Sequence, residues 1–435
     1  MSKIMSSASS PSQVQAPQTN YTRAMAIIGA LFFVFGFVTW LNSVLIPYLK
    51  IACELNNFEA FLVTFAFYIA YLVMGVPAAW LLKKTGFKKG MSAGLLIIAV
   101  GALIFIPAAM TRTYALFLLG LFVQGTGLTV LQAAVNPYVS IIGPPESAAK
   151  RISFMGICNK IAGSAAPFIL GSILLVGTDE LVASLETMDA AQKAAGLDAL
   201  ASRVISPYLF IMVALLLLAV FTYFSGLPEI DTEQENETVA AANTGKTSVF
   251  QFPHLVIGVI SLFLYVGVEV MAGDTVINYA SSQGVPLEEA SRYTTFTLWA
   301  MVIGYSIGIG AIPKYLSQQR ALQICAILGV IFTLMALFTE GSVSVLSISL
   351  LGLANSLMWP TIFPLAIADL GRFTKIGSSL LIMGIAGGAL LPLLYGFLVD
   401  VLNPQSAYWM MVPCYLFIWY FAAIGYKIRT RKVNL

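Results

Sequence analysis

Long apolar runs separated by short polar breaks occupy most of the chain. A membrane-crossing helix needs roughly 20 consecutive apolar residues, and these runs supply about twelve such stretches. The predicted helices cover residues 24–49, 60–82, 90–110, 114–141, 152–176, 205–226, 255–281, 292–312, 321–339, 342–368, 376–399 and 405–427. The pattern therefore predicts an all-α membrane protein with twelve transmembrane helices.

The composition excludes a soluble single-domain protein. Hydrophobic residues make up 59% of the 435 residues and charged residues only 10%, which is more apolar surface than a water-soluble core of this size can bury. The four cysteines stand singly and show neither a CxxC motif nor metal-ligand spacing, so we expect no disulfide and no metal centre. They are Cys53, Cys158, Cys325 and Cys414.

Basic residues are distributed unevenly between the two sides of the predicted membrane. With a cytoplasmic N-terminus, 17 Lys and Arg residues fall on the cytoplasmic side and five fall outside. The positive-inside rule then places both termini in the cytoplasm of a bacterial-type inner membrane. We expect a disordered cytoplasmic tail over residues 1–22 and a basic cytoplasmic tail over residues 428–435.

A polar, acidic stretch over residues 227–252 falls near the middle of the chain. It predicts a cytoplasmic linker between two six-helix halves, residues 23–226 and 253–427. A weak internal repeat supports this division, because Pro137 and Pro167–Gly171 recur as Pro360 and Pro392–Gly396 at an offset of about 225 residues. Parallel halves with a substrate site between them near the membrane midplane are a known transporter plan.

Three charged residues lie inside the predicted membrane helices: Lys160, Glu269 and Asp274. A charge in the bilayer interior costs about 3 kcal/mol on insertion scales, so such residues normally face a cavity or each other. Glu269 and Asp274 are five positions apart and point about 140° away from each other. They share one face only if the helix unwinds, which Gly267 and Gly273 would permit.

We expect Glu269 or Asp274 to belong to the substrate or coupling-ion site, with a possible sodium ion near either acid and Lys160 as a movable counter-charge. The alternative is a fixed ion pair that holds the halves together. A further alternative places Asp274 in water at the outer mouth of the transporter.

Amide side chains suggest what the cavity binds. The fourth predicted helix carries a polar stripe at multiples of four positions: Gln124, Gln132, Asn136 and Ser140. Other predicted helices contribute Asn42, Asn159, Asn278 and Asn355. Carboxamides donate and accept hydrogen bonds together, which suits sugar hydroxyls, and tryptophans stack on the apolar face of a sugar ring. Three tryptophans inside predicted helices could stack on a sugar in this way: Trp40, Trp299 and Trp359.

We therefore predict a substrate-binding set of amides with one aromatic residue. Its members are Asn42, Gln132, Asn136, Asn159, Asn355 and Trp359. The alternative is that single amides only bridge packed helices and that tryptophans mark the lipid interface. The sequence lacks a phosphate-binding loop, an HExxH motif and a nucleophile–base arrangement, so we expect no enzyme and no cofactor.

Several stretches of the predicted helices match a known pattern: Phe33–Asn42, Gln132–Pro137, Gly267–Asp274, Trp359–Pro364 and Lys375–Ser379. Together they resemble the fucose/glucose/galactose:cation symporter family of the major facilitator superfamily. Asn159–Gly163 and Gly273–Asp274 resemble its glucose/galactose branch. The resemblance implies a major facilitator fold and alternating-access import of a hexose, driven by a proton or sodium gradient.

Two positions depart from the fucose/proton branch, which carries an acid after the first-helix Asn and another in the fourth helix. Here these positions are Ser43 and Gln132, and neither exchanges a proton at ordinary pH. Coupling would then use Glu269 or Asp274, or the protein is a hexose uniporter. Sodium is slightly favoured over the proton, because amide and carboxylate oxygens ligate it without titrating.

Other functions remain open at this point. An exporter of another small metabolite or a drug would use a large aromatic cavity with few amides, and a membrane sensor would need a sizeable soluble signalling domain. The chain has amides and no such domain. We expect a monomer surrounded by membrane lipid, with a small-molecule sugar and a sodium ion or proton as partners and no nucleic acid.

Overall fold

The computed structural model describes residues 18–141, 148–227, 247–312, 314–370 and 373–430. Within these ranges the regular secondary structure is entirely helical. Most of the predicted N-terminal tail, linker and C-terminal tail lies outside the described residues, as does the side chain of Ser140. The all-α membrane fold predicted from the sequence is confirmed.

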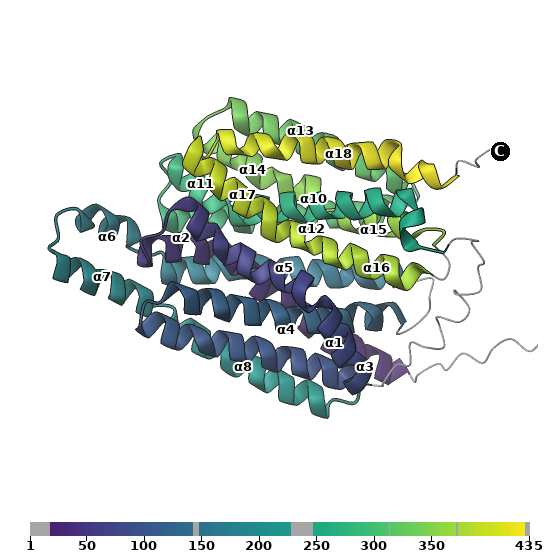
Figure 1. The fold of residues 1–435 in the computed structure, drawn as a ribbon, viewed down its shortest axis with the longest axis horizontal. Coiled ribbons are helices and arrows are strands. Elements are labelled where there is room, and N and C mark those ends of the chain that lie inside the picture. The colour runs from purple at the N-terminus through teal and green to yellow at the C-terminus, as the bar shows by residue number, and fades with distance from the viewer. Residues whose placement is uncertain (1–17, 142–147, 228–246, 313, 371–372, 431–435) are drawn as a thin grey trace, which may run out of the picture.

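We call residues 18–227 the N-terminal half and residues 247–430 the C-terminal half (Figure 1). The helices of the N-terminal half are α1 (Gln18–Trp40), α2 (Asn42–Ala52), α3 (Asn57–Met110), α4 (Tyr114–Ile141), α5 (Ala148–Leu174), α6 (Thr178–Leu185), α7 (Ala190–Ser202) and α8 (Ile205–Phe224).

The C-terminal half begins with a 3-10 turn, η2 (Val249–Gln251). Its α-helices are α10 (Pro253–Asp274), α11 (Val276–Ser282), α12 (Leu287–Ala311), α13 (Gln318–Phe338), α14 (Gly341–Asn355), α15 (Met358–Ile367), α16 (Thr374–Met383), α17 (Gly387–Val401) and α18 (Met411–Ala423). Three further 3-10 turns are η4 (Gly384–Ala386), η5 (Ser406–Met410) and η6 (Gly425–Thr430).

The number of membrane crossings depends on how α3 is divided. The described residues contain 11 helical segments that are long and apolar enough to cross a membrane. One of these is α3, whose 54 residues would span about 80 Å as a straight helix, more than twice the roughly 30 Å of a hydrocarbon core. Gly86 interrupts it with φ 77°, a left-handed conformation open to glycine. Division at Gly86 gives the twelve crossings expected.

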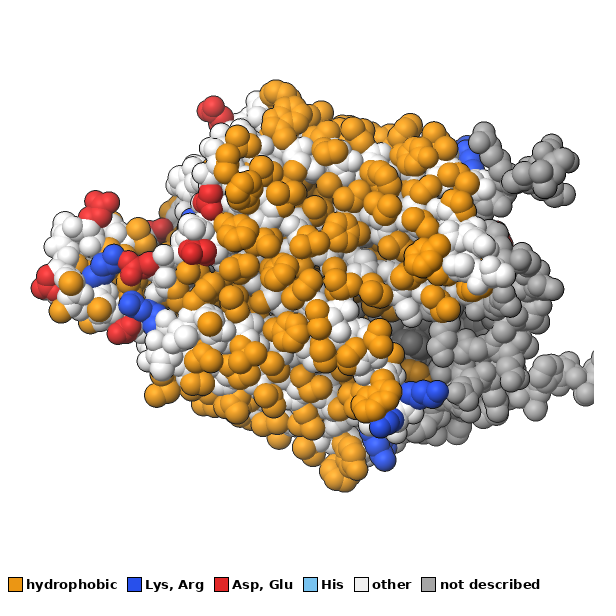
Figure 2. Space-filling view, in the orientation of Figure 1, with side chains coloured by type: hydrophobic (Ala, Val, Ile, Leu, Met, Phe, Trp, Pro, Cys, Tyr) orange, Lys and Arg blue, Asp and Glu red, His pale blue; other side chains and the backbone are white. Residues whose placement is uncertain are grey.

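The molecule has two distinct ends. The helices α2, α6, α7 and α11 gather at one end, which we call the hairpin end, and the beginning of α1 and the end of η6 lie at the other, the terminal end (Figure 1). On the face that Figure 2 shows, apolar side chains cover the surface between the two ends, and charged side chains cluster at the ends themselves. This distribution suits a body that spans a bilayer.

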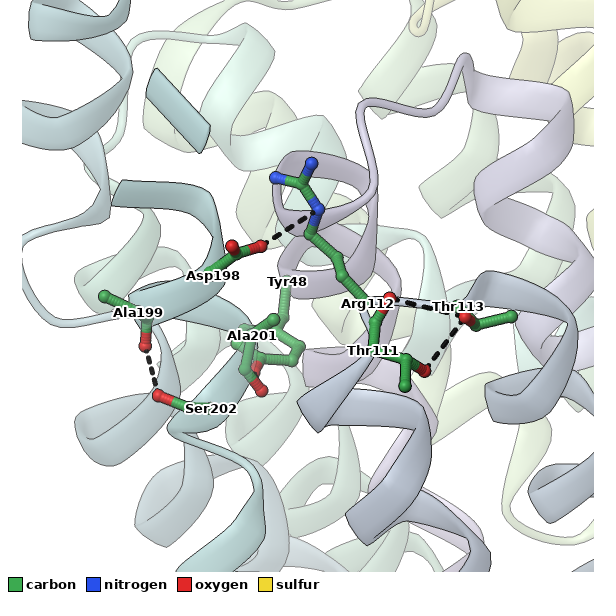
Figure 3. Close-up of polar contacts among 8 residues, drawn as sticks. All are labelled: Tyr48, Thr111, Arg112, Thr113, Asp198, Ala199, Ala201 and Ser202. Carbon is green, nitrogen blue, oxygen red and sulfur yellow. Dashed lines mark hydrogen bonds and ion pairs between the residues drawn. The ribbon is translucent and has the colours of Figure 1, made fainter. Parts of the chain in front are cut away.

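A short helical hairpin, α6–α7, projects from the hairpin end and was not predicted from the apolar runs. The carboxylate of Asp189 caps α7 through a capping box with Gln192. The base of α7 is fixed to the N-terminal half by Tyr48, whose hydroxyl donates to the carbonyls of Leu200 and Ala201. Figure 3 shows Tyr48 beside Ala201.

Two ion pairs strengthen this attachment. Arg112 Nε lies 3.4 Å from Asp198 Oδ1 (Figure 3), and Lys193 Nζ lies 2.5 Å from Glu54 Oε1. Both pairs join the hairpin to turns of the N-terminal half. The hairpin therefore belongs structurally to that half.

The two halves touch along α3 at the hairpin end. On α3, Thr64 and Tyr68 contact the C-terminal half at Asp274 and Gly388. Gly75 follows Tyr68 by seven residues and Thr64 by eleven, and these spacings place it on the same face of α3. A Cβ at Gly75 would nevertheless meet no atom within 4 Å. The structure is thus closed between its halves at the hairpin end, whereas the face of α3 at Gly75, nearer the terminal end, has room for a side chain.

Candidate functional site

The central helix of the site is α10, which runs unbroken from Pro253 to Asp274. The unwinding that Gly267 and Gly273 would permit does not occur in this helix, so the two acids do not share one face. Both glycines instead make room for a neighbour, because a Cβ at Gly267 would lie 2.1 Å from the Leu391 side chain. The helix ends only after Asp274, where α11 continues the chain.

Because α10 keeps its helical form, its two acids face different helices. Glu269 points to α5, where its Oε1 lies 2.7 Å from Lys160 Nζ. Each of the two side chains is 11% exposed, so this ion pair is nearly buried. The pair joins the two halves near the middle of α5 and in the second half of α10, and it neutralises two of the three charges found in the predicted membrane helices.

Trp40, at the end of α1, packs beside this ion pair. The Lys160 ammonium lies 4.7 Å from the centre of the Trp40 ring, a distance that allows a cation–π interaction. A Cβ at Gly163 or Gly273 would lie 2.3 Å or 2.1 Å from the same ring. Trp40 thus fills the space between α5 and α10, and its 2% exposure leaves its ring little free surface for a ligand.

Buried tyrosines surround Glu269 on the side of the C-terminal half. Tyr265, Tyr305 and Tyr415 all lie close enough to interact electrostatically with its carboxylate. Tyr305 also packs near Gly156 of α5, across the boundary between the halves. Their hydroxyl groups provide polar neighbours for the ion pair.

Asp274 has a different environment. It is fully buried, and its Oδ2 accepts a hydrogen bond of 3.0 Å from Thr64 Oγ1 of α3. Its Oδ1 has no hydrogen-bond partner, and no ion pair to Asp274 is found within the described ranges. Water therefore does not reach Asp274 in this structure, because Thr64 and the closed hairpin end exclude solvent.

Hydroxyl groups from α12 hold the backbone just before Asp274. Thr294 Oγ1 donates to the Gly273 carbonyl at 2.7 Å, and Thr297 Oγ1 donates to the Ala272 carbonyl at 3.4 Å. These bonds fix the last turn of α10, so the position of the Asp274 carboxyl group is determined by two neighbouring helices.

Three of the predicted amides lie close together in the N-terminal half. Gln132 Nε2 donates to the hydroxyl of Tyr71 at 2.5 Å, and Gln132 and Asn136 line one small cavity together with Phe32. Asn159 is buried and its Nδ2 lies 3.4 Å from the Phe32 carbonyl. The structure thus brings these three amides to the region where α1, α4 and α5 meet.

The remaining predicted residues lie elsewhere. Asn355 is buried in the C-terminal half, where its Oδ1 accepts a 2.9 Å bond from the Tyr415 hydroxyl. Asn42 is also buried, and the Nδ2 atoms of Asn42 and Asn355 have no partner in the described structure. Trp359 stacks on Phe363 with ring centres 5.9 Å apart. Trp299 is 46% exposed and does not join these buried groups.

A separate cavity of about 670 Å³ lies at the hairpin end between the halves. Its lining includes Lys50, Asn57, Asp179, Asn278 and Leu287. Neither acid of α10 lines this cavity, and neither do the three predicted amides of the N-terminal half, Gln132, Asn136 and Asn159. It is an outlying vestibule rather than the buried site itself.

Several residues of the site were missed from the sequence. Thr64 and Tyr71 have the strongest roles, because they bond to Asp274 and Gln132 respectively. A hydroxyl within an apolar helix gives little signal, since Ser and Thr commonly bond to a carbonyl of their own helix. Tyr68 and Tyr71 do stand three residues apart on one helix face, a spacing that indicates a shared environment.

The sequence and the fold of this chain are similar to those of known membrane transporters. Residues 28–385 match the Major Facilitator Superfamily. A glucose/galactose transporter of Brucella abortus is 36% identical over 413 residues, which cover 94% of this chain and 96% of the relative. The L-fucose-proton symporter of Escherichia coli is 30% identical over 409 residues, 93% of each chain. The crystal structure of the E. coli fucose:proton symporter superposes with a TM-score of 0.68 and 29% identity, over 93% of this chain and 99% of that one.

Proposed function

Since the chain belongs to the Major Facilitator Superfamily, we propose that it is a secondary active transporter that imports a hexose of the glucose/galactose type by cation symport. The relatives named as sugar transporters extend over nearly its full length. The amides Gln132, Asn136 and Asn159 supply donors and acceptors for sugar hydroxyls. Asn42, Asn355 and Trp359 are the further proposed contacts.

The coupling proposal rests on one difference between the two buried acids: Glu269 has a cationic partner, and Asp274 has none in the described structure. Lys160 neutralises Glu269 at 2.7 Å, and no described cation neutralises Asp274. A carboxylate buried without a partner is strongly destabilised, so the closed hairpin end requires Asp274 to hold a proton or a cation. Asp274 is therefore the proposed site of the coupling ion.

The proton suits Asp274 better than sodium does. Sodium needs several oxygen ligands, whereas Thr64 is the one side chain that hydrogen-bonds the Asp274 carboxyl in the described structure. A single proton neutralises the acid without further ligands. Sodium coupling remains the alternative that the experiment below separates from proton coupling.

The proposed coupling follows from where Asp274 lies. Closing the halves at the hairpin end brings Thr64 of one half onto Asp274 of the other. An ionised Asp274 opposes this closure because its charge would be buried without a partner. The transporter would thus close at the hairpin end only after the driving ion has bound.

The test uses Asp274→Asn in proteoliposomes. Asparagine keeps the size of the side chain, so exchange of labelled sugar without a gradient should continue, while uptake against a sugar gradient should fail. Imposed proton and sodium gradients, applied separately to the parent protein, identify the driving ion. Concentrative uptake by Asp274→Asn at the parental level would overturn the assignment.

We propose that the hairpin end faces outward and that the termini and the linker over residues 227–252 are cytoplasmic. Basic residues support this orientation, since they cluster on the predicted cytoplasmic side. The proposed six-helix halves are residues 23–226 and 253–427. The proposed location is a bacterial inner membrane, and the proposed oligomeric state is a monomer. Single cysteines at Ser7, Thr238 or Val433 should resist an impermeant reagent applied to intact cells, and labelling there would contradict the orientation.

A further inference from the structure

Two carboxylates at the hairpin end reach from one half to the other. Asp179 lies in the first turn of α6 in the N-terminal half, and Asp400 lies near the end of α17 in the C-terminal half. Each accepts a hydrogen bond from the backbone N–H at the start of a helix in the opposite half. The two contacts therefore run in opposite directions across the same boundary.

Asp400 completes the N-terminus of α3. Its Oδ2 accepts from the Phe58 N–H at 2.8 Å, and its Oδ1 accepts from the Asn57 N–H at 3.2 Å and from Asn57 Nδ2 at 2.7 Å. The capping box of α3 itself uses Asn56 and Glu59 and leaves these two N–H groups open. The Asn57 and Phe58 N–H groups therefore find their acceptor in the C-terminal half, at Asp400.

Asp179 plays the same part at α12. Its Oδ2 accepts from the Leu287 N–H at 2.9 Å. The residue before α12 is Pro286, which has no side-chain group to cap a helix, and α12 has no side-chain cap from its own sequence. The start of α12 thus depends on a carboxylate from the N-terminal half.

Electrostatics favour both contacts in the closed arrangement. A helix N-terminus carries a partial positive charge that attracts a carboxylate. Lys50 adds to this attraction at α3, because its Nζ donates to Asn57 Oδ1 at 2.6 Å and its charge attracts Asp400. When the halves separate at this end, both carboxylates lose these partners together.

The attachment of the α6–α7 hairpin makes the Asp179 contact sensitive to that separation. The ion pair Arg112–Asp198 (Figure 3) and the ion pair Lys193–Glu54 hold the hairpin on the N-terminal half. Asp179 therefore moves with that half, while Leu287 moves with the other. Asp179, Leu287 and Asn57 also line the 670 Å³ cavity, so the two contacts border the vestibule at this end.

We infer that Asp179 and Asp400 form a reciprocal latch that holds the hairpin end of the transporter closed. The inference rests on the alternating access proposed above and adds the residues that set the balance between its two states. Each cap is exposed to solvent, so each should favour the closed arrangement by about fivefold. Because the two sites are separate, their effects should multiply to about 25-fold.

The latch is tested with two cysteine reporters in full-length protein whose native cysteines are replaced by alanine. Ser291→Cys reports on the hairpin end, because Ser291 is 2% exposed and packs against Gly171 between α12 and α5. Gly75→Cys reports on the open face of α3 near the terminal end. An impermeant maleimide labels both reporters. The labelling rate of Ser291→Cys is measured in right-side-out vesicles, and that of Gly75→Cys in inside-out vesicles.

Asp179→Asn and Asp400→Asn should each raise the labelling rate of the Ser291→Cys reporter about fivefold, and the double variant should raise it about 25-fold. Labelling at position 75 should stay constant or fall. Glu180→Gln is the matched control, since Glu180 lies beside Asp179 on α6 and no hydrogen bond from it to the other half is found in the described structure. It should leave both rates unchanged.

Two results would overturn the latch. One is a labelling rate at position 291 that stays at the level of Glu180→Gln in both single variants. The other is a parallel rise at positions 291 and 75, which would indicate a loosened fold instead of an opened end. Labelling requires neither sugar nor an ion gradient, so an error in the proposed sugar or coupling ion would leave this outcome unaffected.

Discussion

Glu269 and Asp274 lie on the same buried helix, five residues apart, yet their surroundings differ in the feature that matters for transport. Glu269 faces α5 and is paired with Lys160, whereas Asp274 faces α3 and has the Thr64 hydroxyl as its one hydrogen-bond partner among the described residues. A paired charge can remain ionised through a transport cycle, but an unpaired one must take up an ion to be buried. The comparison teaches that the side of the helix on which an acid lies, more than its depth, decides whether it has a charged partner.

The largest expected effect comes from breaking the pair at Glu269. Glu269→Gln strands the Lys160 ammonium in a nearly buried position, which should lower the free energy of unfolding by about 3–5 kcal/mol. Thermal unfolding of purified protein in detergent measures this loss. The double variant Glu269→Gln with Lys160→Met should regain most of the stability, and a double variant as unstable as the single one would contradict the pairing role.

Asp274→Asn should behave in the opposite way in the same unfolding measurement. It removes an acid that no described cation neutralises, so it strands no charge and should keep the parental stability or exceed it. A loss as large as that of Glu269→Gln would show that Asp274 has a cationic partner and would remove the basis of the comparison.

A smaller effect is expected where Trp40 packs between α5 and α10. Gly273→Ala puts a Cβ 2.1 Å from the Trp40 ring, and such overpacking should cost about 1–3 kcal/mol of stability and slow transport. Gly75→Ala is the matched control, because a Cβ there meets open space. Equal unfolding temperatures for the two variants would show that Trp40 does not pack tightly at this point.

Sugar binding should depend on the amides of the N-terminal half and not on either acid. Gln132→Ala should weaken sugar binding by about 1–3 kcal/mol through loss of a buried hydrogen bond. Tyr71→Phe, which removes the hydroxyl that accepts from Gln132, should have a smaller effect because the amide itself remains. Ligand binding to purified protein measures both, and unchanged affinity in Gln132→Ala would remove this amide from the proposed site.

Much of the fold was predictable because membrane helices carry a strong and local signal. Apolar runs located the crossings, and the cost of burying charge singled out Lys160, Glu269 and Asp274. The angle between positions five apart on a helix also indicated that the two acids face different neighbours. These inferences need only the properties of one helix at a time.

What the sequence could not show are contacts between helices. From the sequence, Gly267 and Gly273 would permit an unwound helix, but in the structure each allows a bulky side chain of another helix to approach closely. Thr64 gave no signal because its role depends on the docking of α3 against α10. The reciprocal caps of Asp179 and Asp400 depend likewise on the arrangement of the two halves.

The central claim is that Asp274 carries the coupling ion and that the Glu269–Lys160 pair does not. Its most direct test is the pH of a weakly buffered suspension of proteoliposomes when sugar is added outside. For the parent protein and for Glu269→Gln with Lys160→Met, sugar should drive protons inward and make the medium alkaline. Asp274→Asn should give no pH change although it still exchanges sugar. A proton signal that survives in Asp274→Asn and disappears in the double variant would contradict the account.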